Sequence, residues 1–228
     1  MKKPKIPREA LLEKIRNTEA FKEKAPLREE AARAAIPILA DLHEIGLDLE
    51  SLSELRDRRI LKKAVPILVK WLPLITHPWI KQAVARLLGS SVAKGSANHA
   101  LISEFKSPAL DESTRWALGN SISLIAETSD VGELINLATD KKFGRAREMI
   151  VAGLGTFSRE SDDAFEALCQ LVNDPDVSGH AISALGNSQR PAAASIVEKF
   201  VDHPNTFLRR EARRAVSKLR KGSQPSAH

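Results

Sequence analysis

The 228-residue sequence has no tyrosine, few aromatic residues and a single cysteine. Aromatic residues make up 4% of the chain, and the apolar residues are mostly Leu, Ala, Ile and Val, a composition that favours helices over sheets. The one cysteine, Cys169, cannot form a disulfide within the chain, which fits a reducing compartment. Because Cys169 lies in an apolar run, we interpret it as a small buried hydrophobic residue rather than a nucleophile.

Long apolar segments are also missing. No stretch approaches the roughly 20 apolar residues that cross a bilayer, and the basic N-terminus, Met1 to Pro7, lacks the apolar core of a secretory signal. We therefore expect a soluble, cytoplasmic protein of bacterial type with no membrane partner. The hydrophobic fraction of 43% is high enough to build a core and excludes disorder for the bulk of the chain.

The net charge of +6 is unevenly distributed. Residues 1–70 have a net charge of +4, residues 71–200 of −3, and residues 201–228 of +5. A protein that follows a nucleic-acid backbone needs cations along its whole groove. The charge distribution therefore predicts that any nucleic-acid binding is weak and non-specific.

The clearest positive feature is an internal repeat. Five segments of twelve residues align with one another in a common frame: 78–89, 108–119, 144–155, 175–186 and 206–217. Four of them begin with Pro or Gly and end with Gly, and offsets below are counted from the first residue of each segment. Apolar residues recur at offsets 2, 6, 9 and 10, which place them on one face of a helix. Proline is tolerated in the first turn of a helix, and a glycine in the left-handed conformation commonly ends one.

Another apolar segment with helical character precedes each framed segment. Ala35 to Leu39 and Ala64 to Leu68 extend this pattern of first helices upstream. The sequence therefore predicts an all-α fold, an α-solenoid (α-α superhelix) of about six helix pairs. We expect residues 1–25 to be a charged lead-in with one helix, around Arg8 to Phe21, residues 26–220 to form the array, and residues 221–228 to be a disordered tail.

The repeat resembles HEAT repeats, in the short form found in phycobilin-lyase-like bacterial proteins. The similarity rests on Asn173 to Val177 opening a second helix and on the Ala-x-x-Ala-Leu-Gly pattern closing it, with related residues at 115–120, 144–149 and 208–212. The resemblance covers roughly residues 30–220, implies the armadillo-type α-solenoid fold, and assigns no function. HEAT repeats often have Arg at offset 3, forming a ladder. Lys81, Arg147 and Arg209 match this feature, whereas Asp111 and Ser178 depart from it.

No catalytic group, metal site or cofactor site is expected. The six histidines show no metal-ligand spacing, and no glycine-rich phosphate loop or Gly-x-Ser-x-Gly motif occurs. His43-Glu44 is similar to the His-Glu pairs of HEAT-repeat di-iron hydroxylases, but those enzymes need several such pairs and this chain has one.

The expected binding surface is a stripe along the second helices. It mixes aromatic, Arg, Asn and His side chains, which is the composition of an interaction surface. Packing between repeats is the alternative reading for Trp79 and Trp116, and a structural role is the alternative for His180. The predicted binding residues are Trp79, Arg86, Trp116, Asn120, Arg145, His180, Arg210 and Arg214.

Three functions fit this reading. The first is a non-enzymatic scaffold or adaptor that binds a protein partner. The second is a nucleic-acid-binding protein or a repair enzyme resembling HEAT-like DNA glycosylases, with Trp116 and either Asp111 or Glu112 in the active site. The third is a lyase-like or chaperone-like protein that handles a prosthetic group. The sequence leaves the partner and the oligomeric state open.

Overall fold

A computed structural model describes residues 18–222, and these residues form helices and turns without a β-strand. The chain divides into two compact units, Met1–Glu54 and Leu55–His228. The first unit contains α2, Glu19–Glu23, and α3, Ala25–Glu44. The helix expected from Arg8 to Phe21 lies mostly outside the described residues, as do residues 223–228 of the expected tail.

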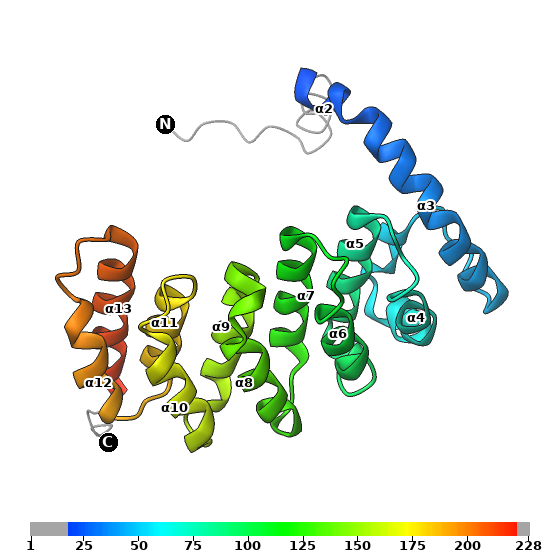
Figure 1. Cartoon of the computed structure of the whole chain (residues 1–228). Coiled ribbons are helices and arrows are strands. Elements are labelled where there is room, and N and C mark those ends of the chain that lie inside the picture. The colour runs from blue at the N-terminus through cyan, green and yellow to red at the C-terminus, as the bar shows by residue number, and fades with distance from the viewer. Residues whose placement is uncertain (1–17, 223–228) are drawn as a thin grey trace, which may run out of the picture. The chain divides into compact units, whose positions relative to one another are not determined.

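The second unit is an array of five helix pairs (Figure 1). Each second helix contacts the second helix of the next pair, so the second helices form one layer and the first helices another. The predicted all-α solenoid is therefore confirmed. The first helices are α4 (Arg58–Trp71), α6 (Asn98–Phe105), α8 (Val131–Thr139), α10 (Asp162–Leu171) and α12 (Ala192–Val197). The second helices are α5 (Pro78–Leu88), α7 (Glu112–Ile125), α9 (Glu148–Phe157), α11 (Ser178–Asn187) and α13 (Thr206–Gly222).

Short 3-10 helices complete the connections: η1 (Leu52–Arg56), η2 (Ser91–Ala93), η3 (Thr128–Asp130), η4 (Lys141–Arg147) and η5 (Glu198–Phe200). Local side chains fix where several helices begin. The carboxylate of Asp57 accepts the backbone N–H of Arg59 at the start of α4, and Asp111 accepts that of Thr114 at the start of α7. Such caps satisfy amide groups that have no partner inside the helix.

The apolar stripe of the repeat forms the core of the array. In α11 its members Val177, Ala181, Ala184 and Leu185 are at most 2% exposed. The equivalent offsets in the other second helices are mostly buried as well, because this face packs against the preceding first helix and the neighbouring second helices. The frame read from the sequence therefore identifies the core face correctly.

The expected role of the repeat glycines is wrong for three of the four. Gly89 does end α5 as its C-cap residue, although with a φ of −71° and not in the left-handed conformation. Gly119, Gly155 and Gly186 lie inside α7, α9 and α11, and none of them has the positive φ of a left-handed cap. Two of them instead lie where neighbouring second helices approach most closely. A Cβ atom at Gly155 would lie 2.9 Å from Cβ of Ala184, and one at Gly186 would lie 2.7 Å from Cα of Ala215. These glycines therefore permit close helix packing rather than ending the helices.

Two of the residues at offset 3, Arg147 and Ser178, donate to the end of a first helix, whereas Lys81 forms a buried ion pair with Glu104. Arg147 Nη1 donates to the carbonyl of Ala138 at 3.0 Å, and Ser178 Oγ donates to that of Val172 at 2.7 Å. Both acceptors lie at the end of a first helix, where carbonyl groups have no partner in the helix. In the repeat that has Asp111 at offset 3, Arg115 takes over this task and donates to the carbonyls of Phe105 and Ser107.

Candidate binding surface

The first part of the predicted stripe lies on α5 and α7. Trp79 and Trp116 are 39% and 38% exposed, so each ring is partly packed and partly free for contact. Arg86 Nη2 donates to Gln82 Oε1 at 3.1 Å, and Gln82 Nε2 donates to Ser113 Oγ of the next second helix at 3.0 Å. Side-chain contacts thus connect neighbouring repeats along this surface.

Asn120 lies one helical turn after Trp116 on α7 and is half-buried. Residues four apart share one face of a helix, so Asn120 lies on the same side of α7 as Trp116.

Trp116 and Arg145 meet at a common carboxylate. Trp116 Nε1 donates to Glu148 Oε2 at 3.3 Å, and Arg145 Nη2 donates to Glu148 Oε1 at 2.9 Å. Arg145 lies in η4 just before α9, and its side chain is 69% exposed. The first turn of α9 therefore links two residues that the sequence placed in different repeats.

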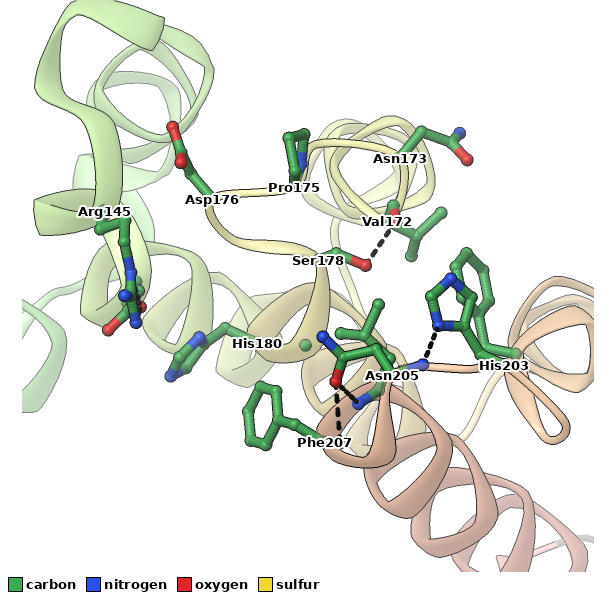
Figure 2. A pocket seen from close by; sticks show the side chains of 14 residues that line it. Arg145, Val172, Asn173, Pro175, Asp176, Ser178, His180, His203, Asn205 and Phe207 are labelled. Carbon is green, nitrogen blue, oxygen red and sulfur yellow. Dashed lines mark hydrogen bonds and ion pairs between the residues drawn. The ribbon is translucent and has the colours of Figure 1, made fainter.

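A groove of about 610 Å³ opens beside Arg145 and Glu148 (Figure 2). Its wall includes the first residues of α9, α11 and α13. His180 lies between Arg145 and Phe207 in this view. The lining residues also include Asn173, Pro175, Asp176, Ser178, Gly179, Phe200, His203 and Asn205.

Phe207 forms the aromatic part of the groove. It packs directly on Gly179, where an added Cβ would lie 2.0 Å from its ring, and its ring centroid is 6.1 Å from that of His180. Arg210 lies over the other part of the ring, with its guanidinium carbon 5.3 Å from the centroid. The ring therefore lies between residues of two repeats while remaining 39% exposed.

The stripe ends on α13 at Arg210 and Arg214. Both side chains are more than half exposed and pair with Glu211, at 3.2 and 3.0 Å respectively. The structure thus places the predicted residues on consecutive second helices or on the turn before one, and connects Trp116, Arg145, His180 and Arg210 through shared neighbours.

Among the titratable groups of the described residues, Asp111 and Cys169 have shifted pKa values. Burial works to raise the pKa of Asp111, but hydrogen bonds from Ser113 and Thr114 outweigh it and lower this pKa to about 2. Asp111, one of the two acidic residues considered for a glycosylase, is thus an ionised carboxylate that caps the start of α7. The half-buried Cys169 is unsuited to nucleophilic attack, because burial and the nearby Glu166 raise the pKa of its thiol.

Within residues 18–222, no three His, Cys, Asp or Glu side chains are arranged to hold a metal ion. None of the helices in this part of the chain is long and apolar enough to cross a membrane.

Sequence reasoning did not select Glu148 or Phe207 as binding residues. Phe207 occupies the same offset in its segment as Trp79, so the repeat frame contained a signal for it. Asp176 has the same offset in its segment and carries the same signal, whereas Glu148 and His203 lie outside the stripe and have none. The fold brings these residues to one groove.

Two comparisons with known proteins found a similarity. No curated protein matches the sequence. One similar solved structure is human deoxyhypusine hydroxylase in complex with glycerol, at 15% identity over 80% of this chain and 88% of that chain. The TM-score of 0.31 is too low for this likeness to support an activity. A family model described as HEAT repeats matches residues 131–218, which extend from α8 through most of α13.

Proposed function

We propose that this protein is a binding scaffold that holds a segment of a partner protein on the face of its second helices. The observation that supports this most directly is the groove between Arg145 and Phe207, which continues a row of half-exposed aromatic and charged side chains. HEAT arrays generally present extended surfaces of this kind to other proteins.

The chemistry of the row suits protein recognition. Trp79, Trp116 and Phe207 each keep more than a third of their surface exposed, and a partner that covers them gains apolar burial at low entropic cost. The exposed ion pairs beside them, such as Arg145 with Glu148, contribute little stability on their own. They are therefore available to select a partner by charge.

The remaining features of this proposal come from the sequence. We expect a cytoplasmic, bacterial protein of the short phycobilin-lyase-like repeat type, acting without a cofactor and without specific nucleic-acid recognition. The partner protein supplies the specificity, and the array supplies a rigid surface.

The test is an affinity capture from lysate of the source cells followed by measurement of the recovered partner's affinity. Trp116→Ala should weaken the affinity by about 30-fold, or ~2 kcal/mol, as expected for a hot-spot residue of an interface. The matched control is Leu74→Ala, which removes another exposed apolar side chain in the turn after α4 and should leave the affinity unchanged. A partner that binds the Trp116→Ala protein as tightly as the wild type would show that the second-helix face is not the interface.

A further inference from the structure

The outward face of α13 bears two rows of cationic side chains. One row contains Arg209 and Arg213, and the other contains Arg210, Arg214 and Lys218, with members of each row four residues apart. These five residues, with Thr206 and Ser217, line a shallow groove of about 670 Å³. We refer to this groove as the arginine groove.

The composition of α13 indicates that its arginine-bearing face is exposed to solvent. For comparison, α11 packs between α9 and α13 and buries small or apolar residues on more than one side, such as Gly179, Ile182 and Gly186. α13 buries Ala212, Ala215, Val216 and Leu219 on one side and places its arginines opposite them. A polar outer face of this kind is typical of the capping helix of a repeat array.

The cations of the groove exceed the carboxylates that contact them. Glu211 pairs with both Arg210 and Arg214, and Asp202 pairs with Arg213 at 3.2 Å. The other two cations meet neutral oxygens. Arg209 Nη1 donates to the carbonyl of His203 at 2.7 Å, and Lys218 Nζ donates to Asn187 Oδ1 at 2.8 Å. Five positive charges thus face two negative ones.

Most of these cations can be reached by a partner. The side chains of Arg210, Arg213 and Arg214 are 57%, 62% and 63% exposed. Only the pair of Arg213 with Asp202 is exposed on both sides among these three, and such pairs contribute about 0–1 kcal/mol, so a carboxylate from another molecule can replace Asp202 at little cost. Glu211 is 12% exposed, but Arg210 and Arg214 each keep further N–H donors for a second carboxylate. A guanidinium also binds carboxylates through two parallel hydrogen bonds, which makes arginine effective in this role.

We propose that the arginine groove binds an acidic segment of a partner protein, with Asp or Glu at alternate positions. Residues four apart on a helix are separated by about 6 Å along its axis, and alternate residues of an extended peptide by about 6.6–6.8 Å. An extended segment lying along α13 therefore places successive carboxylates at the spacing of the cations in each row. This surface meets the groove of Arg145 and His180 at Arg210, which packs on Phe207. The inference therefore rests on the proposed function and adds the chemistry of the segment that binds at this end of the face.

Other anionic partners fit the surface less well. Glu211 and Asp202 contact the arginines of the groove and would repel a continuous phosphate backbone. The central residues 71–200 have a net charge of −3 and cannot extend the contact. A membrane surface would need apolar residues beside the cations, whereas the apolar side of α13 is buried in the array.

The experiment is a fluorescence anisotropy titration of the full-length protein with a labelled twelve-residue peptide of alternating Glu and Ser. The paired substitution Arg213→Gln and Arg214→Gln should weaken binding at least tenfold. The matched control is Lys62→Gln with Lys63→Gln, which removes two exposed charges from α4 and should change binding less than twofold. If the first pair lowers the melting temperature, Arg210→Gln with Lys218→Gln provides a second variant with the same expected loss.

Three results would overturn the inference. The peptide could fail to bind at low salt, the control pair could weaken binding as much as the groove pair, or a single-stranded oligonucleotide of equal charge could bind more tightly than the peptide. Trp116→Ala should leave binding of the acidic peptide unchanged. Loss of peptide binding in the groove variants alone, or loss of partner capture in Trp116→Ala alone, therefore separates this inference from the proposed function.

Discussion

Arg147 is the residue on which most buried polar contacts of the array converge. Its side chain is fully buried, and it donates to the carbonyls of Gly144 and Ala138 and to the carboxylates of Asp174 and Asp176. A buried cation is tolerated only when its donors are satisfied in this way. Arg147 therefore connects η4, the end of α8 and the loop before α11.

Arg147→Ala should lower the free energy of unfolding by about 3–5 kcal/mol, because the buried carboxylate of Asp174 loses its partner. The measurement is urea unfolding followed by circular dichroism. Arg213→Ala is the matched control, since both side chains of its pair with Asp202 are exposed, at 62% and 89%, and the pair should contribute less than about 1 kcal/mol. Equal losses of unfolding free energy in the two variants would contradict the burial of Arg147.

The Arg147→Ala variant should also change how the stability of the protein depends on pH in acid. Burial works to raise the pKa of Asp174, but the hydrogen bonds from Arg147 and from the amide of Asp176 outweigh it and lower this pKa below its usual value. The unfolded chain then binds a proton below pH ~3.9 while the folded one does not. Asp174 therefore stabilises the fold above that pH and loses its effect as the pH falls further. Arg147→Ala should flatten this acid dependence of the melting temperature.

The sequence predicted part of this chemistry. Arg147 occupies the ladder position of the repeat, so its structural role could be expected from the resemblance. The residues that replace this arginine in other repeats were not predictable. Arg115 donates to the same kind of carbonyl from a different offset, and Ser178 does so through a short hydroxyl side chain.

At the scale of the helix, glycine determines how closely the second helices pack. The repeat frame located Gly155 and Gly186 correctly, but the spacing alone could not distinguish a helix end from a helix contact. The neighbouring helix resolves this, because a Cβ at Gly186 would lie 2.7 Å from the backbone of Ala215.

Gly186→Ala should therefore destabilise the protein by about 1–3 kcal/mol, although alanine is the better helix former. The control is Gly132→Ala in α8, where no atom lies within 4 Å of the added Cβ and the change should be neutral or stabilising by up to about 1 kcal/mol. Urea unfolding of the two variants compares them directly. A Gly186→Ala protein as stable as the wild type would mean that α11 and α13 are not packed through this glycine.

At the scale of the molecule, the sequence determined the fold better than the binding surface. Repetition with a helical period predicts a stack of helix pairs, because each pair can bury its apolar face only against its neighbours. The surface depends on residues such as Glu148 and His203, which lie outside the stripe. They come together through the angles between helices, and a one-dimensional pattern does not contain those angles.

The charge of the whole array leads to the last prediction, that duplex DNA binds weakly, without sequence preference and only at low salt. Cations cluster in residues 1–70 and 201–228, whereas the segment 175–186 contains no Lys or Arg. Contacts from Arg209, Arg210, Arg213 and Arg214 to four phosphates would give a slope of about −3.6 in log affinity against log salt, at about −0.9 per phosphate. Anisotropy titrations of two matched duplexes of different sequence, repeated across salt concentrations, measure this slope. Submicromolar binding at physiological salt, or a clear preference for one duplex, would favour a nucleic-acid-binding protein over a protein scaffold, because a short basic face on one helix cannot provide either property.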